Sequence, residues 1–251
     1  MQIYEEIARH QPSPTFLADR VIVVSGAGQG LGRAVALDAA KHGATIALLG
    51  RSSKKLEATF DAIVASGAPT PAIAPLDFAT ASDQDFTQLA QMIGHELGRC
   101  DGIVHCAALL KHLQPLKHEP LEDWLAMLRV NLAAPFALTR ACLPLLQQSD
   151  NGSVVFVSET HGLRPAAYWG GFAVSKFALS GLMQVWNDEL SREDSPRMNI
   201  VIPGPMQSPQ RARTHPGEDK SLLKHPEDLT AAFLYLLSTD SKKVRGQTLE
   251  L

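Results

Sequence analysis

The stretch VIVVSGAGQGLGRAVALDAAK, residues 21–41, decides the fold of this chain. It opens with a short β-branched run that is apolar on both faces, which is typical of a strand in a parallel sheet covered by helices on both sides. Three glycines follow, at Gly26, Gly30 and Gly32, and then a helix-like segment begins. A strand, a tight glycine turn and a helix in this order predict a site where backbone N–H groups at a helix N-terminus receive a pyrophosphate.

Similar short apolar runs recur along the chain, separated by longer amphipathic stretches. The runs that predict strands cover residues 21–25, 45–50, 71–77, 102–107, 153–158 and 198–204. The intervening stretches are long enough for helical crossovers between parallel strands. The pattern therefore predicts an α/β fold, a single doubly wound parallel sheet of the Rossmann type with helices on both faces.

Three further segments complete the organisation. Residues 1–18 contain two prolines and are interpreted as an N-terminal extension that packs on, or trails from, the domain formed by residues 19–251. The segment 121–148 is apolar around much of its helical circumference, which predicts a long helix buried against the sheet or a partner subunit. The segment 205–225 is polar and rich in turn-forming residues, so a mobile loop or lid is expected there.

Composition restricts the classes of partner. The 251 residues are 45% hydrophobic and 20% charged, which suits one globular domain. The net charge of −3 gives no positive field to attract phosphates, so neither nucleic acid nor an anionic membrane is an expected partner. A small molecule or a second copy of the chain is expected instead.

Location and metal content are constrained by other features. Cys100, Cys106 and Cys142 are too few and too irregularly spaced for a disulfide framework or a zinc site, which favours a reducing compartment. The N-terminal stretch MQIYEEIARHQPSPTF lacks the basic and apolar regions of a signal peptide, and no apolar run approaches the roughly 20 residues that cross a bilayer. We therefore expect a cytoplasmic protein. The histidines show no metal-ligand spacing, so no metal site is expected.

The residue that follows the second predicted strand bears on the choice of nucleotide. A carboxylate about 20 residues beyond the glycines would bond the ribose 2′-hydroxyl of NAD. Gly50 and Arg51 stand there instead, and a guanidinium can pair with a 2′-phosphate. NADP(H) is therefore favoured over NAD(H), although Gln29 supplies no second basic group. Asp77, which ends the third predicted strand, is a candidate to bond the adenine amino group.

On these motifs, the chain resembles the classical short-chain dehydrogenase/reductase family over roughly residues 19–251. The matching motifs fall in the family's order and spacing: the glycine motif at 26–32, Asp77, Asn131 within RVNL, SVVFVS at 153–158, Lys176, and PGPMQS at 203–208. The segment WGGFAVSKFA at 169–178 is similar to the sequences of a bacterial cytoplasmic subgroup whose substrates are generally unassigned. The resemblance implies cofactor contacts from Ser25, Gly26, Gln29, Gly30, Leu31, Gly32, Arg51, Asp77, Phe78, Ala107, Lys176, Pro203 and Gly204.

In this family an Asn, a Ser, a Tyr and a Lys act together on a carbonyl/alcohol pair. The resemblance implies that the tyrosine donates the proton, the serine steadies the carbonyl oxygen, the lysine holds the nicotinamide ribose and the asparagine keeps a relay water. Asn131 and Lys176 match this set. Phe172 stands in the tyrosine position, and Glu159 stands thirteen residues earlier, in the serine position. Shifting the alignment to use Ser158 would point that side chain to the opposite face of the strand, unless the strand has ended or bulged.

These substitutions predict weak or absent family activity. Phenylalanine has no proton to donate, and general acid catalysis contributes about 100- to 10,000-fold. An ionised Glu159 only accepts hydrogen bonds and would repel a forming alkoxide. HCAA at 105–108 also replaces the family's usual Asn-Ala-Gly stretch beside the cofactor. An active reductase with a reassigned acid remains an alternative, with a protonated Glu159, Tyr168 or His161 as the acid. A non-catalytic nucleotide-binding or scaffold protein is a further alternative.

The resemblance also implies an oligomer. Family members commonly form dimers and tetramers through their long helices, so a homodimer or homotetramer is expected through the segments 121–148 and 170–192. The wall that selects the substrate is expected from residues 205–225, and these residues do not name the substrate.

Overall fold

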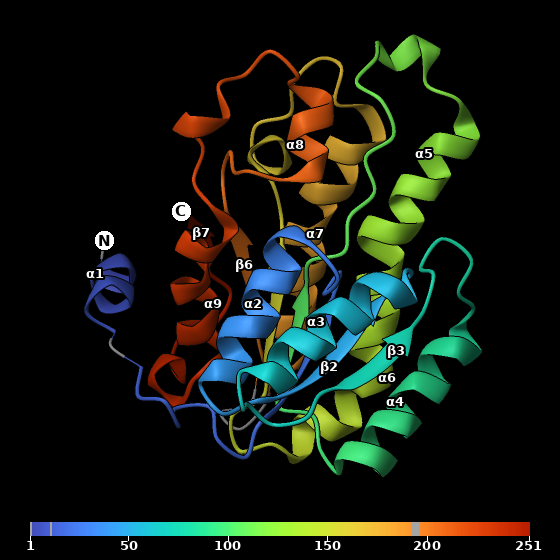
Figure 1. Cartoon of the computed structure of the whole chain (residues 1–251). Helices are drawn as coiled ribbons and strands as arrows, with labels where there is room; N and C mark the ends of the chain where they lie inside the picture. The colour runs from blue at the N-terminus through green and yellow to red at the C-terminus, as the bar shows by residue number, and fades with distance from the viewer. Residues whose placement is uncertain (1, 11, 192–195) are drawn as a thin grey trace.

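A parallel sheet of seven strands runs through the middle of the computed structural model, which describes residues 2–10, 12–191 and 196–251 (Figure 1). Its strand order is β3-β2-β1-β4-β5-β6-β7. The six predicted strands are confirmed, with ends that shift by up to about two residues. The seventh strand was not predicted because it is only three residues long and only Leu249 in it is buried. The strands are β1 (Val21–Ser25), β2 (Thr45–Gly50), β3 (Ala72–Pro75), β4 (Gly102–His105), β5 (Ser153–Val157), β6 (Arg197–Ile202) and β7 (Thr248–Glu250).

The order of the strands fixes where a ligand can bind. From β1 the chain winds outward to β2 and β3, returns to β4 beside β1, and then winds outward in the other direction to β7. The carboxyl ends of β1 and β4 are therefore the point where the winding reverses, and open α/β sheets bind ligands at that point. Ser25 is paired with His105 across these strands, so the glycine turn after β1 lies beside residues 106–108.

Helices cover both faces of the sheet, which confirms the doubly wound prediction (Figure 1). One apolar cluster joins the sheet to α2, α3 and α9, and a second joins the opposite face to α4, α6 and α7. Among the described residues, no helix combines the length and apolar character needed to cross a bilayer. The helices are α1 (Gln2–Arg9), α2 (Gly30–Lys41), α3 (Ser53–Ala65), α4 (Asp83–Leu97), α5 (Leu121–Leu128), α6 (Ala134–Gln148), α7 (Gly170–Glu189), α8 (Pro209–Thr214) and α9 (Thr230–Leu237).

The helix predicted over 121–148 is present but is not uniform. Helices α5 and α6 are joined without a break by a π-helical turn, Arg129–Ala133, which contains Asn131. π-turns inside helices are frequent at functional sites because they rotate side chains out of the regular helical pattern. The sequence pattern gave no sign of this local change.

The N-terminal extension packs on the domain through α1. The Tyr235 hydroxyl in α9 donates a hydrogen bond of 2.5 Å to the Glu6 carboxylate, and the Glu250 backbone N–H donates one of 3.0 Å to the Tyr4 hydroxyl. Because β7 is the edge of the sheet, the second bond satisfies an edge N–H that would otherwise face solvent. Residues 1 and 11 of the predicted extension lie outside the described residues.

The segment 205–225, expected to be a mobile loop, has regular structure. It contains α8 and a 3₁₀ turn, Lys220–Leu222, and its two ends meet at a parallel bridge between Met206 and Lys224. Figure 1 shows this segment above the carboxyl ends of the strands. Within it, Ser208 caps α8 by accepting from Arg211 N. That the segment acts as a mobile loop or lid stays a prediction.

Candidate functional site

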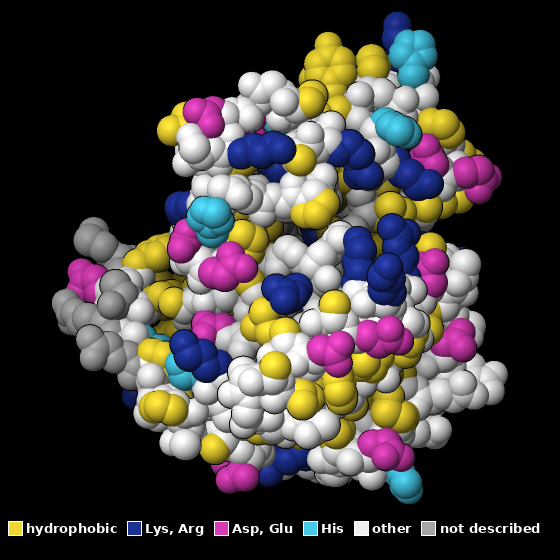
Figure 2. All heavy atoms as spheres, viewed as in Figure 1, with side chains coloured by type: hydrophobic (Ala, Val, Ile, Leu, Met, Phe, Trp, Pro, Cys, Tyr) yellow, Lys and Arg dark blue, Asp and Glu magenta, His cyan; other side chains and the backbone are white. Residues whose placement is uncertain are grey.

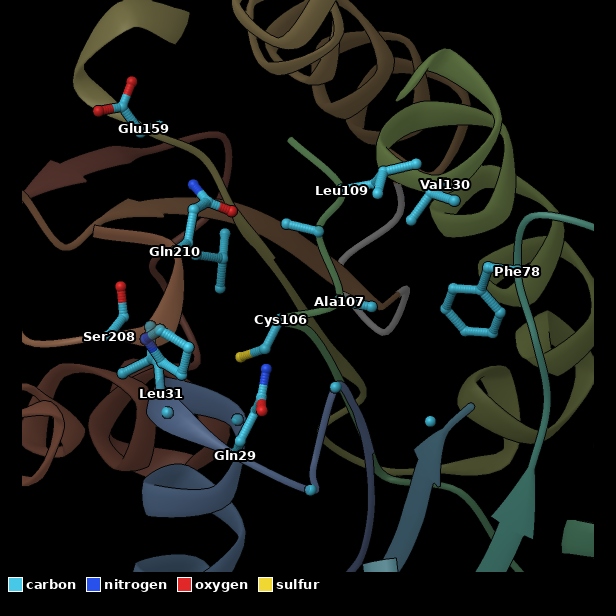
Figure 3. Close-up of a pocket in the computed structure, with 18 of the residues that line it drawn as sticks. Gln29, Leu31, Phe78, Cys106, Ala107, Leu109, Val130, Glu159, Ser208 and Gln210 are labelled. Atoms are coloured by element: carbon cyan, nitrogen blue, oxygen red, sulfur yellow. The ribbon is translucent and has the colours of Figure 1, made fainter. Parts of the chain in front are cut away.

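A cavity opens at the carboxyl ends of the central strands, where the fold places the point of reversed winding. Its walls come from the segments that follow β1 to β6, from α7 and from α8 (Figure 3). Figure 2 shows Lys and Arg side chains gathered across the middle of this face, between α8 above and the α2–α3 region below. Every predicted cofactor residue except Ser25 lines this cavity: Gly26, Gln29, Gly30, Leu31, Gly32, Arg51, Asp77, Phe78, Ala107, Lys176, Pro203 and Gly204.

The glycine turn forms a cradle whose backbone leaves no room for side chains on its inner side. A Cβ on Gly26, which has a φ of +70°, would lie 2.9 Å from the Ala107 backbone nitrogen. A Cβ on Gly32 would lie 2.5 Å from the Gly26 carbonyl oxygen. A Cβ on Gly30 would meet nothing within 4 Å, so this residue borders open space at the N-terminus of α2. Open space against backbone N–H groups at a helix N-terminus fits the pyrophosphate of a dinucleotide.

Ser25 supports this cradle from behind. It is buried, and its hydroxyl accepts a hydrogen bond of 3.1 Å from the Ala107 backbone N–H. The bond ties the end of β1 to the segment after β4. The structure therefore places Ser25 next to the cavity wall and outside the lining itself.

Two basic side chains lie where the adenosine end of a dinucleotide would be held. Arg51, directly after β2, is exposed and lines the cavity, as does Lys55 in the first turn of α3. The Lys55 ammonium donates to the Gln29 side-chain oxygen, which bridges α3 and the glycine turn. Sequence reasoning missed Lys55, although it lies only four residues after Arg51, in the first turn of the helix that follows.

Asp77 lies on the same side of the cavity. One of its carboxylate oxygens accepts a 3.0 Å hydrogen bond from the Ala79 N–H, which holds the turn after β3. Phe78 follows it and is buried against Phe86. This turn places a carboxylate and an aromatic ring along one wall of the cavity.

Lys176 lies at the inner end of the cavity and is only 4% exposed. Its ammonium donates a 2.7 Å hydrogen bond to the Val157 carbonyl at the end of β5. Burial lowers the pKa of Lys176 to about 8, against the weaker opposing effects of Cys106 and Glu159. The Phe172 ring centroid is 5.8 Å from the Lys176 nitrogen, one helical turn earlier in α7. Phe172 is 1% exposed and packs with Leu110 and Met127.

The side chains of Glu159 and Ser158 are both hydrogen-bonded to nearby backbone groups. The Glu159 carboxylate accepts a 2.7 Å hydrogen bond from the His161 N–H and so caps the 3₁₀ turn Thr160–Gly162. Figure 3 shows this carboxylate directed away from Cys106. The Ser158 hydroxyl donates 3.1 Å to the Lys176 carbonyl oxygen in α7. Both residues line the cavity, and each side chain has a hydrogen-bond partner within the protein.

Asn131 lies next to the cavity but outside its lining, and its role with the relay water stays a prediction. Its side-chain oxygen accepts 2.7 Å from the Leu109 N–H, and its amide nitrogen donates 2.9 Å to the Leu109 carbonyl. The same nitrogen donates 3.0 Å to the Ser175 hydroxyl. Asn131 therefore acts on the cavity through Leu109, which lines it.

Tyr168 and His161, considered as replacement acids, do not line the cavity. Tyr168 is 58% exposed and has a φ of +75°. The His161 ring packs on Trp169 with a centroid distance of 4.1 Å, and Trp169 is the residue that reaches the cavity wall. Among the residues that the structure describes, no group of three or more His, Cys, Asp or Glu side chains is arranged to hold a metal ion.

Helix α8 covers the outer part of the cavity and is hydrogen-bonded to the segment after β4. Gln210, Arg211 and Thr214 line the cavity from above. The Arg213 guanidinium donates a 2.6 Å hydrogen bond to the carbonyl of Leu110, the residue after Leu109 of the cavity wall. Sequence reasoning did not find this contact because the two residues are 103 positions apart.

Comparisons with known proteins agree with this geometry. The family model of short chain dehydrogenases matches residues 20–219. An uncharacterized oxidoreductase, YciK, of Escherichia coli strain K12 is 39% identical over 241 residues, which cover 96% of this chain and 95% of that protein. A short chain dehydrogenase from Salmonella enterica serovar Typhi CT18 superposes with a TM-score of 0.93 at 38% identity, covering 96% and 99% of the two chains. A structure from E. coli CFT073 solved with NADPH has a TM-score of 0.91 at 40% identity, covering 95% and 99%.

Proposed function

Because the chain belongs to the short chain dehydrogenase family, we propose that it binds NADPH and reduces a small carbonyl compound slowly, without the family's tyrosine proton donor. The observation that carries the cofactor is the open cradle at Gly30, with Arg51 and Lys55 at its outer end. The E. coli CFT073 neighbour solved with NADPH supports the same cofactor here.

Different residues around the cavity would hold different parts of the cofactor. Backbone N–H groups at the start of α2 would hold the pyrophosphate, and Arg51 and Lys55 would pair with the 2′-phosphate. Asp77 would bond the adenine amino group, and Lys176 would reach the nicotinamide ribose. When bound, the cofactor supplies a hydride.

The proposed slow rate follows from the side chains at the inner end. Phe172 gives no proton, and the Glu159 carboxylate is an acceptor aimed at the His161 N–H. Loss of a general acid alone removes about 100- to 10,000-fold in rate. Trp169, Phe172 and Leu109 make the substrate end of the cavity apolar, which suits an aliphatic or aromatic carbonyl compound.

Binding of NADPH by variants tests the cofactor assignment. Arg51→Ala and Lys55→Ala should each weaken NADPH binding by about 10-fold or more while leaving NADH binding nearly unchanged, since each removes one cation from the 2′-phosphate. Lys54→Ala is the matched control, because Lys54 is exposed on the same helix turn and does not line the cavity. Equal losses for NADPH and NADH would contradict the assignment. Binding without reduction of any carbonyl in a broad panel would favour the non-catalytic alternative.

We further propose a homodimer or homotetramer through α5, α6 and α7. Large apolar side chains stand exposed on these helices: Leu121, Leu125, Phe136, Val174, Phe177 and Val185. Exposed apolar groups gathered on adjacent helices are typical of subunit contacts. Light scattering after chromatography should give a multiple of 27.1 kDa, and Phe177→Asp with Val174→Asp should shift it to the monomer. A wild-type monomer would contradict this proposal.

We propose the cytoplasm as the location. The three cysteines are free thiols, and Cys100 and Cys142 are buried side by side in the core without a disulfide. A reducing compartment preserves such thiols. Fractionation of cells that carry a tagged chain would test the assignment, and recovery from an oxidising compartment would contradict it.

A further inference from the structure

Among the described residues, the ammonium of Lys176 lies at the inner end of the cavity, one helical turn from Phe172. We propose that Lys176 itself donates the proton to the carbonyl oxygen of the substrate, in place of the missing tyrosine hydroxyl. This inference rests on the proposed function, slow carbonyl reduction. It assigns the chemistry to a residue otherwise expected only to hold the ribose.

The geometry places Lys176 where a donor is needed. Phe172 and Lys176 are four residues apart in α7, so they share one face of the helix, and both line the cavity. The Lys176 nitrogen is 5.8 Å from the Phe172 ring centroid. Of the three residues of the α7 region that line the cavity, Trp169, Phe172 and Lys176, only Lys176 has a side chain that ionises near neutral pH. A lysine ammonium has three N–H donors. Val157 takes one of them at 2.7 Å, which leaves one donor for the nicotinamide ribose and one for a substrate oxygen.

The charges around Lys176 keep this proton transferable. Cys106 faces it from the segment after β4 and Glu159 from the segment after β5, and both favour the charged form. His105 on β4 is buried, and its own pKa is lowered to about 3, so it is neutral near pH 7. Burial outweighs these effects and lowers the pKa of Lys176 to about 8. An acid with a pKa near the working pH is the most effective proton donor.

Other groups at the site are poorer donors. Burial raises the pKa of the Cys106 thiol to about 12, so it holds its proton too firmly. Glu159 accepts from the His161 N–H, and Tyr168 and His161 do not line the cavity. Lys176 is therefore the donor that the geometry favours among the described residues.

The proposed step balances with the NADPH of the proposed function and one proton from solvent. The carbonyl carbon accepts a hydride, and the π electron pair of the carbonyl moves to oxygen. As the oxygen–hydrogen bond forms, one N–H bond of Lys176 breaks and leaves a neutral amine. The amine then takes a proton from water. The source of the hydride, oxidised in the same step, is the NADPH of the proposed function.

The first test uses the free protein. Lysines labelled at Cε with ¹³C give NMR signals whose shifts follow ionisation, and comparison with Lys176→Met identifies the Lys176 signal. Lys176 should titrate near pH 8, well below the value of about 10.4 for a lysine in a model peptide. A Lys176 signal that titrates together with the exposed lysines would overturn the proposal.

The second test compares turnover while NADPH binding is measured separately in every variant. Wild-type reduction should fall about tenfold per pH unit above pH 8, because the ammonium is lost there. Lys176→Arg keeps the charge but does not titrate in this range, so its slower reduction should not fall near pH 8. Lys176→Met should lose about 100-fold or more at saturating NADPH. Phe172→Tyr in the Lys176→Met background should recover part of the rate, because it returns an acid and shows that the site still folds.

These outcomes distinguish failure of the Lys176 proposal from failure of the proposed function. Reduction by Lys176→Met at the wild-type rate would overturn the proposal, and so would tight NADPH binding by a wild-type protein that reduces no carbonyl. In both cases the cofactor assignment would stand. A wild-type protein that binds no NADPH would instead remove the proposed function on which the inference rests.

Discussion

The carboxylate of Glu119 accepts a hydrogen bond of 2.9 Å from the backbone N–H of Gly171, and so caps the N-terminus of α7 from 52 residues away. This helix carries Phe172 and Lys176, so the cap fixes the inner end of the cavity. Glu119→Ala should destabilise the fold by about 1 kcal/mol and lower Tm, because an N-terminal N–H and the positive end of the helix lose their partner. Glu119→Gln keeps an acceptor and should lose less. Equal Tm values for Glu119→Ala and wild type in thermal melts would contradict this role.

Substitution in the glycine cradle should remove cofactor binding. Gly26→Ala brings a Cβ within 2.9 Å of the Ala107 nitrogen at a φ of +70°, so the turn must open. NADPH affinity should fall by more than about 10-fold. Gly217→Ala is the control, since a Cβ there meets nothing within 4 Å. Gly26→Ala with unchanged affinity in a fluorescence titration would show that the cofactor binds elsewhere.

Restoring the family's side chains should raise activity. Phe172→Tyr adds a hydroxyl at the inner wall of the cavity, and Glu159→Ser removes an acceptor that would repel an alkoxide. The double variant should reduce carbonyl compounds about 100-fold faster than the wild type. The assay is NADPH oxidation with a panel of aldehydes and ketones. If the double variant shows no gain across the panel, these two positions do not limit catalysis.

Removal of the hydrogen bond between α8 and Leu110 should weaken binding of the carbonyl substrate. Arg213→Ala removes the 2.6 Å hydrogen bond from α8 to the Leu110 carbonyl, which should raise KM for the carbonyl substrate severalfold and leave NADPH affinity unchanged. Hydrogen exchange of residues 205–225 should become faster at the same time. Arg213→Lys, which keeps a donor, is the conservative control. Unaltered exchange in Arg213→Ala would mean that other contacts hold the segment.

His105 should make the fold sensitive to acid. It is stacked on Phe156 and buried, and its folded-state pKa is about 3, against 6.5 for an unperturbed imidazole. Between these values the unfolded chain binds a proton that the folded chain does not, so stability is present above pH 6.5 and falls as the pH drops toward 3. The slope from this residue is about 1.4 kcal/mol per pH unit. His105→Gln should flatten this part of the stability–pH curve in urea melts, and an unchanged curve would contradict the assignment.

The fold could be predicted because its signals are local. The run at 21–25, the glycine turn after it and the apolar runs of the later strands each appear in a few consecutive residues, and the comparisons confirm the family that they indicate. The edge strand β7 was missed because three residues carry no periodic pattern. The π-turn that contains Asn131 was missed because helix-forming residues continue through it.

The site could be predicted only in part, because some of its contacts join segments that are far apart in the sequence. The residues near the glycine turn and after the strands lie around the cavity, because strand ends in a parallel sheet meet at one edge. Their roles remain predictions. Contacts between distant segments had no local signal: Glu119 with Gly171, Arg213 with Leu110, and Lys55 with Gln29. The hydrogen bond from the His161 N–H to the Glu159 carboxylate also depends on the turn that follows β5, which the sequence pattern did not indicate.

Titration of the purified wild-type protein with NADPH and with NADH, followed by nicotinamide fluorescence, tests the cofactor assignment. With Arg51 and Lys55 on the 2′-phosphate, NADPH should bind at least about 10-fold more tightly than NADH. Equal affinities, tighter binding of NADH, or no binding of either nucleotide would contradict the cofactor on which the proposed chemistry depends.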